Sequence, residues 1–198
     1  MTKRDEMIAF ATERHAGQFR KFGLSHIPYV IHPIEVSDRV ARLAGATEAM
    51  VVAALAHDLI EDTATTRAEI AERFGEGVAD LVVELTDHYT PETHPGLSRR
   101  ERKALENARQ AAMSREAKLI KLADVANNLG NMIPVGYAAS GGEISFGGLF
   151  IREKDAILAA IGGADAELRA EVAAASDGLA ERLALADAAR KARKLAGA

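Results

Sequence analysis

The sequence predicts an all-α protein, a compact bundle of roughly eight to ten helices. Strong helix formers such as Ala, Leu, Glu, Arg and Lys dominate the 198 residues, whereas aromatic residues, which favour strands, make up only 5%. Capping residues and glycines also divide the chain into segments of helical length. Because no linker or internal repeat interrupts this pattern, we expect a single domain over residues 1–198.

The helices of the first part of the chain have recognisable starts and stops. Thr2 can cap a first helix, which Gly17 ends. Pro33 suits the first turn of a second helix, which stops at Gly45. Thr47 can cap a third helix, which continues through the segment ATEAMVVAALAHDLIED. Since that segment is apolar on most sides, we expect it at the centre of the bundle.

The later helices are predicted from similar signals. Thr66-x-x-Glu69 and Ser98-x-x-Glu101 match capping boxes, so each is expected to open a helix. Ser114 can cap a helix that carries the run KLIKLADVANNL. Further helices are expected at 76–86, at about 147–161 and at 165–196. Three segments without helical periodicity are predicted to be loops that can carry substrate contacts: 18–31, 87–97 and 134–147.

The composition limits the chemistry. The chain has no Cys, which excludes disulfides, iron–sulfur clusters and Cys nucleophiles, so any metal ion must be held by His and carboxylates. Its net charge of −4 gives no general attraction to nucleic acid or to a membrane surface. Since the chain also lacks a long apolar run and an amino-terminal signal segment, we expect a cytoplasmic protein.

The run His57-Asp58-x-x-Glu61-Asp62 is the first candidate site. Chance alone produces a His-Asp dipeptide in roughly one such chain in three, so the context matters. On a helix, His57 and Glu61 share one stripe and Asp58 and Asp62 share the next. Like charges gathered at the end of a buried helix need a cation. The alternative is a solvated, frayed helix end that leads into a polar loop.

Two distant residues can complete a metal site. His32 stands at the start of the second helix, where a lone His is more often a capping or core residue. Asp124 lies inside an apolar helix, where an Asp is unfavourable unless it binds something. With Lys121 and Asn128, at offsets of three and four, it forms one polar stripe. The alternative is an Asp–Lys pair on an exposed face.

The candidate ligand set therefore has two His and two carboxylates: His32, His57, Asp58 and Asp124. Such a set suits a divalent ion with open coordination positions, Mn²⁺ first and then Fe²⁺, Co²⁺ or Mg²⁺. Structural zinc sites more often have four closed ligands, commonly with Cys, so a catalytic ion is favoured.

These four residues, in this chain order, resemble the metal ligands of the HD superfamily. The segments HAGQFRKFG with PYVIHP, HDLIEDT and KLADVANNL resemble three motifs of the hydrolase domain of RelA/SpoT proteins. The resemblance spans roughly residues 7–160 and leaves a helical carboxy-terminal extension at 165–196. The chain thus looks like a stand-alone small alarmone hydrolase, with an HD-domain helical bundle as its expected fold.

The resemblance implies hydrolysis of the 3′-diphosphate of guanosine or adenosine alarmones such as (p)ppGpp, the nucleotides of the stringent response, with release of pyrophosphate. Glu61 and Asp62 match the catalytic acidic pair of that family. Arg20 and Lys21 match its basic pair near the nucleotide, and Asn128 matches an Asn placed for the ribose or a phosphate. The expected partner is a small nucleotide, and the protein is expected to be a monomer or a homodimer.

The sequence departs from the family pattern outside the metal site. Val125 stands where the family usually has Arg or Lys, Asn127 where His is common, and Phe150 where many relatives have Tyr. These departures leave the base and ribose preference open.

Two other functions remain possible for the sequence. One is an HD-type phosphatase that acts on a nucleoside monophosphate or NADPH and releases orthophosphate. The other is a non-catalytic nucleotide sensor, which the presence of all four ligands and both acids disfavours.

Overall fold

The computed structural model describes residues 1–21, 24–132 and 142–196, with only the backbone over 142–145. In this part of the chain the regular structure is helical, and the only β-type pairing is an isolated bridge between Phe19 and Pro28. The prediction of an all-α fold is confirmed. Among the described helices, none is long and apolar enough to cross a membrane.

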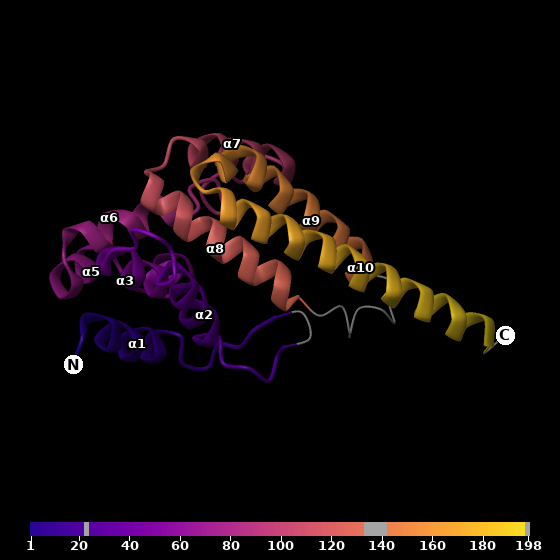
Figure 1. Cartoon of the computed structure of the whole chain (residues 1–198), viewed down its shortest axis with the longest axis horizontal. Coiled ribbons are helices and arrows are strands. Elements are labelled where there is room, and N and C mark those ends of the chain that lie inside the picture. The colour runs from indigo at the N-terminus through magenta and orange to yellow at the C-terminus, as the bar shows by residue number, and fades with distance from the viewer. Residues whose placement is uncertain (22–23, 133–141, 197–198) are drawn as a thin grey trace.

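The elements follow one another along the chain as α1 (Lys3–Arg14), α2 (Ile31–Val40), α3 (Glu48–Ala56), α4 (Leu59–Asp62), α5 (Arg67–Phe74), α6 (Glu76–Leu85), α7 (Arg99–Ala111), α8 (Arg115–Asn131), α9 (Gly142–Ile161), η1 (Gly162–Ala164) and α10 (Ala166–Ala196). Helices α1 to α6 gather at one end of the molecule, and α9 and α10 lie at the other (Figure 1). Helix α8 runs between the two groups and contacts α2, α3, α6, α9 and α10.

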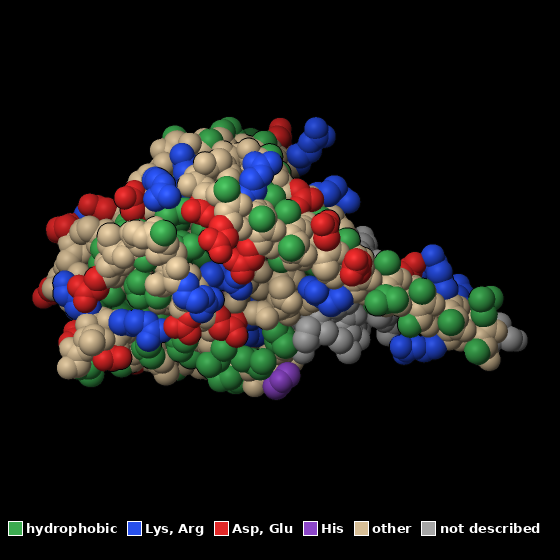
Figure 2. Space-filling view, viewed as in Figure 1, with side chains coloured by type: hydrophobic (Ala, Val, Ile, Leu, Met, Phe, Trp, Pro, Cys, Tyr) green, Lys and Arg blue, Asp and Glu red, His purple; other side chains and the backbone are tan. Residues whose placement is uncertain are grey.

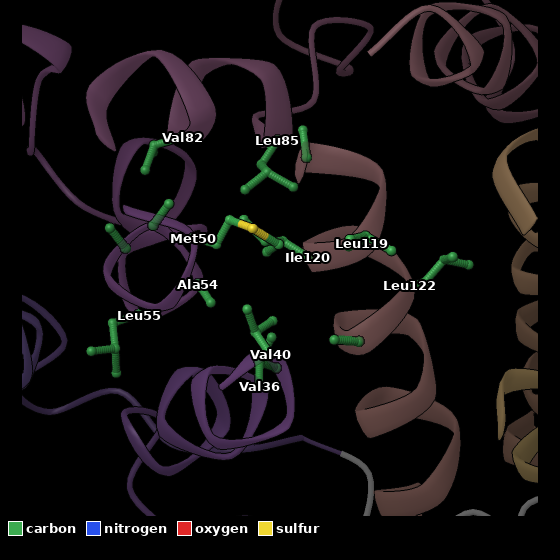
Figure 3. Close-up of a cluster of buried hydrophobic side chains, with 14 of the residues drawn as sticks. Val36, Val40, Met50, Ala54, Leu55, Val82, Leu85, Leu119, Ile120 and Leu122 are labelled. Atoms are coloured by element: carbon green, nitrogen blue, oxygen red, sulfur yellow. The ribbon is translucent and has the colours of Figure 1, made fainter. Parts of the chain in front are cut away.

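The main core lies where α3 and α8 meet, with α2 and α6 beside them (Figure 3). Met50 of α3, Leu85 of α6 and Ile120 of α8 gather there, and each is at most 2% exposed. Truncation of such side chains costs about 2–5 kcal/mol, so this contact holds α3 and α8 firmly together. The prediction that α3 is central is confirmed. Both helices carry candidate ligands, so the core also fixes the position of the site.

One of the two predicted capping boxes forms completely. Ser98 accepts a hydrogen bond from the backbone N–H of Glu101, whose carboxylate accepts one from the Ser98 N–H in return. Thr66 caps α5 by accepting from the Glu69 N–H, but the Glu69 carboxylate pairs with Arg14 of α1 instead. The box prediction at Thr66 is therefore only half right, because a tertiary ion pair competes for the carboxylate.

The helix predicted to continue from Thr47 through Asp62 is broken in the structure. Helix α3 ends at Ala56, and the shorter α4 begins at Leu59 after a turn at His57 and Asp58. In a regular helix, neighbouring side chains point about 100° apart around the axis. His57 and Asp58 keep right-handed helical dihedral angles, and the Asp62 N–H still donates to the Asp58 carbonyl at 2.9 Å, so the predicted one-turn spacing of Asp58 and Asp62 survives the break. His57 and Glu61 lie on opposite sides of the break, and the side chains of His57 and Asp58 face one centre.

The start of α9 also differs from the prediction. The helix begins at Gly142, so 142–147 is helical rather than loop, while 134–141 lies outside the described residues. Glycine explains the error, because here it serves close packing rather than a turn. A Cβ placed on Gly147 would lie 2.6 Å from a methyl carbon of Leu183 in α10. The loop predicted at 18–31 is non-helical where described except for Ile31, the first residue of α2, and the loop predicted at 87–97 is non-helical throughout.

Candidate metal centre and substrate cleft

Three of the four predicted ligands meet at one point between α2, α3 and α8. His32, His57 and Asp124 each offer one ligand atom, and these atoms lie within 4.8 Å of one another. The Asp124 Oδ1 atom is 3.2 Å from His32 Nε2 and 3.8 Å from His57 Nε2. All three residues are buried. Residues that are 92 positions apart in the sequence, His32 and Asp124, are thus brought together by the packing of α2 against α8.

The two imidazoles are oriented for metal binding. His32 Nδ1 hydrogen-bonds Asn127 Oδ1 at 2.7 Å, and His57 Nδ1 hydrogen-bonds the Ala54 carbonyl at 2.8 Å. Because both partners are acceptors, each Nδ1 carries a proton, so Nε2 is the ring nitrogen of each His that a metal ion would bind. His57 Nε2 is buried and makes no hydrogen bond of good geometry, although Asp58 Oδ2 lies 2.9 Å from it. A bound cation would satisfy this nitrogen.

The charge at the centre also fits a cation. Burial lowers the pKa of His57, but the neighbouring Asp58 and Asp124 outweigh this and raise the pKa to about 9. Burial likewise opposes ionisation of Asp124, yet Lys121, with Nζ 3.3 Å from Oδ2, holds the pKa of Asp124 well below its usual range. The centre therefore carries an excess of negative charge, which a proton or a divalent ion can balance.

Asp58 lies beside this group of three. Its Oδ2 atom is 2.9 Å from His57 Nε2 and 3.7 Å from His32 Nε2. The same oxygen accepts a 2.5 Å hydrogen bond from the Tyr29 hydroxyl. Burial and the charge of Asp58 raise the pKa of Tyr29, so Tyr29 remains a donor. Its position in the segment PYVIHP, three residues before His32, is the only sequence signal that could have indicated this role.

The acidic pair of α4 borders the centre. Glu61 accepts a hydrogen bond from the backbone N–H of Asp87, at the start of the loop after α6. Although Glu61 reaches solvent at the rim, partial desolvation on its protein side raises its pKa to about 7, against the effect of Lys121. Asp62 is also exposed, and desolvation followed by the charge of Asp58 raises its pKa. A carboxylate with a pKa near 7 suits proton transfer at neutral pH.

A cleft with two lobes opens beside the centre, and Tyr29, Asp62 and Asn128 line both lobes. We call the first the arginine lobe. It measures about 150 Å³, and its other walls are Arg20, Lys21, Asn131, Met132 and Phe150. We call the second the lysine lobe. It measures about 220 Å³, and its charged walls include Lys103, Lys121, Lys154, Asp58, Glu61, Asp87 and Asp124.

The structure brings the predicted site residues together around this cleft. Arg20 and Lys21 lie in the arginine lobe, and Asn128 donates a 2.5 Å hydrogen bond to Asp124 Oδ1 at the junction. Sequence reasoning missed Lys103 and Lys154, which local periodicity does not separate from ordinary surface cations. The assignment of roles to these residues stays a prediction.

The fold and the site have the features of one class of protein: helical domains in which an adjacent His-Asp pair joins a distant His and a distant Asp. The chain belongs to the HD domain family, whose model matches residues 8–138.

Several known proteins are similar to this chain. The guanosine-3′,5′-bis(diphosphate) 3′-pyrophosphohydrolase MESH1 of Xenopus tropicalis is 41% identical over 125 residues, which cover 63% of this chain and 66% of the frog protein. The match thus spans slightly less than two thirds of that relative. The enzyme of the same activity from Aquifex aeolicus is 51% identical over 77 residues, 39% of this chain and 10% of that protein.

A solved structure is similar over most of the fold. It is described as a metazoan ortholog of SpoT that hydrolyzes ppGpp and plays a role in starvation responses. Its TM-score is 0.72 at 30% identity, and the alignment covers 88% of this chain and 94% of that one. The similarity therefore extends beyond the matched family model toward the carboxy-terminal helices.

Proposed function

We propose that this protein is a divalent-metal-dependent hydrolase that removes the 3′-diphosphate of guanosine alarmones such as (p)ppGpp as pyrophosphate. The observation that carries this proposal is the meeting of His32, His57 and Asp124 within 4.8 Å, beside an acidic pair and a cleft with cationic walls. The relatives named above support the substrate class. We further propose Mn²⁺ as the ion, with Fe²⁺, Co²⁺ or Mg²⁺ as alternatives, and the cytoplasm as its location.

Different residues bind the metal ion, transfer protons and bind the nucleotide in this reaction. A bound divalent ion supplies a Lewis acid that acidifies water and polarises a phosphate oxygen. His32, His57 and Asp124 would hold it, with Asp58 as the fourth ligand, which Tyr29 orients.

Glu61 and Asp62 transfer the protons of the reaction. Glu61 accepts the proton of the attacking water, since its pKa of about 7 leaves a basic fraction at neutral pH. The water oxygen bonds to the inner phosphorus, and the bond from that phosphorus to the ribose 3′ oxygen breaks. Asp62, with a raised pKa, lies where it can return a proton to the 3′ oxygen. Arg20, Lys21 and Asn128 bind the nucleotide in the arginine lobe.

The proposal is tested by following the products. Bound metal is measured first, and ppGpp, pppApp, NADPH and nucleoside monophosphates are then assayed with Mn²⁺ for pyrophosphate and orthophosphate. We expect pyrophosphate from ppGpp, and a loss of about a hundredfold or more in kcat for Asp58→Ala. The matched control is Asp177→Ala, an exposed Asp of α10. Orthophosphate from NADPH or a monophosphate, with no pyrophosphate from any alarmone, would replace this function with the phosphatase alternative.

A further inference from the structure

The lysine lobe contains three cations from three different helices. Lys103 lies on α7, Lys121 on α8 and Lys154 on α9. Lys103 Nζ is 2.9 Å from Asp87 Oδ2, and Lys121 Nζ is 3.3 Å from Asp124 Oδ2. Both of these lysines are therefore already paired with a carboxylate.

Lys154 differs from the other two. Among the described residues, none forms a hydrogen bond or an ion pair with its ammonium group. Its ammonium group lies over the Phe150 ring, whose centroid is 5.1 Å from Nζ. Since Phe150 lines the arginine lobe and Lys154 the lysine lobe, Lys154 lies near the junction of the two.

An unpaired cation in this position is unfavourable for folding. Burial lowers the pKa of Lys154, and repulsion from Lys121 and Lys103 lowers it further, against the attraction of Asp124 and Asp87. Unpaired charge inside a protein costs stability unless an opposite charge is bound. Of the two carboxylates that attract Lys154, Asp87 already pairs with Lys103 and Asp124 with Lys121, and neither lies within ion-pair distance of the Lys154 ammonium group. A bound anion would provide the missing partner for Lys154.

We propose that Lys154, together with Lys121 and Lys103, binds the outer phosphoryl group of a 3′-diphosphate and, after cleavage, the same group of the pyrophosphate product. This inference rests on the proposed function, because that function places the inner phosphoryl group at the metal centre. The lysine lobe borders this centre through Asp58 and Asp124, while the predicted nucleotide residues Arg20 and Lys21 line the other lobe. The outer phosphoryl group therefore has a cationic wall of its own.

Calorimetric titration of the Mn²⁺-loaded protein with inorganic pyrophosphate, and separately with orthophosphate, tests this subsite. Loss of one charge-assisted hydrogen bond should weaken pyrophosphate binding about tenfold or more in Lys154→Met. Orthophosphate binding should change much less, because a single phosphate can stay at the metal centre. Arg152→Met is the matched control, since it removes an exposed cation two residues away on α9 and should leave both affinities unchanged.

Thermal unfolding of the same variants separates a binding role from a structural one. Lys154→Met should be at least as stable as the wild type, because it removes a desolvated, repelled charge. Lys154→Gln provides a second variant if the Met side chain disturbs packing, and it should show the same selective loss of pyrophosphate affinity. Unchanged pyrophosphate affinity in both variants, or equal losses for pyrophosphate and orthophosphate, would overturn the assignment.

Failure of this subsite and failure of the proposed function give different results. If ppGpp is hydrolysed but both Lys154 variants bind pyrophosphate normally, the subsite is wrong and the function stands. If no alarmone is hydrolysed while pyrophosphate binding still depends on Lys154, the subsite stands as a diphosphate site and the function is wrong.

Discussion

The side chain of Asn127 shows how a residue outside the predicted ligand set can support one inside it. Its Nδ2 atom donates a 2.8 Å hydrogen bond to Glu35 Oε2, which leaves Oδ1 to accept from His32 Nδ1 at 2.7 Å. Glu35 also accepts from Asn131. The carboxylate thus fixes which way the Asn127 amide points, and the amide in turn fixes the proton of His32 on Nδ1. Asn127 is a positioning residue for this metal ligand.

Asn127→Ala should therefore weaken metal binding while leaving the fold intact. Loss of a partner that orients a ligating His typically costs about 10- to 100-fold in metal affinity. The measurement is competition with a chelator of known affinity, with circular dichroism to check the fold. Asn131→Ala removes the 2.8 Å bond to Glu35 and a 3.2 Å bond to Asn127 Oδ1 but keeps the bond between Asn127 and His32, so its effect should be much smaller. Similar losses in the two variants would argue against a specific role for Asn127.

Glu61 predicts a pH dependence. Its pKa is raised to about 7, chiefly by desolvation, and its basic form is the one assigned to proton transfer. The value of kcat/KM should therefore rise with pH and level off above about pH 7. Glu61→Gln, which can still accept the Asp87 N–H bond, should lose most of kcat, keep the metal and lose this acidic limb. An unchanged pH profile in the variant would exclude Glu61 as the base.

The raised pKa of Glu61 also makes the stability of the fold depend on pH. The folded pKa lies above the usual value of 4.5, so the folded state binds this proton more tightly than the unfolded state. Stability contributed by the protonated form is therefore lost as pH rises through about 7. The metal-free wild type should lose stability relative to Glu61→Gln over the interval from about pH 4.5 to 7 in denaturant titrations.

At the scale of the elements, the break between α3 and α4 is the main feature that periodicity did not predict. The apolar and acidic pattern of the segment fits a continuous helix, and nothing local marks His57 as its end. At the break, the tertiary partner Tyr29 binds Asp58, and His57 hydrogen-bonds the Ala54 carbonyl of the preceding turn. A local pattern can therefore predict the ligands while it misses the helix break between them.

Helix packing at the start of α9 can be tested with two adjacent glycines. A Cβ on Gly147 would lie 2.6 Å from Leu183 Cδ2, whereas a Cβ on Gly148 would meet only Arg152 Nη1, at 3.7 Å. Gly147→Ala should lower the free energy of unfolding by about 1–3 kcal/mol through overpacking. Gly148→Ala should raise it by about 0.5–1 kcal/mol, because Ala is the better helix former. Denaturant titration measures both, and equal effects would show that α10 does not restrict Gly147.

At the scale of the whole molecule, helix α8 explains why the site was partly predictable. Its strong apolar pattern predicts a central helix, and the polar residue Asp124 within it is conspicuous for that reason. The lysine lobe was not predictable in the same way. Lys103, Lys121 and Lys154 lie on three helices, and a local sequence pattern does not tell which helices become neighbours. Motifs predicted the centre of the site, while the packing of α7, α8 and α9 determines its outer wall.

The far end of α10 has a practical consequence. The last buried residue of this helix in the described chain is Leu183, and beyond it the helix projects past the other helices (Figures 1 and 2). Leu195 there is 80% exposed, and the chain contains no Cys. Leu195→Cys would therefore give a single thiol for a fluorophore or a surface tether, at a position remote from the cleft. Ligand binding could then be followed on immobilised or labelled molecules with the catalytic centre left unmodified.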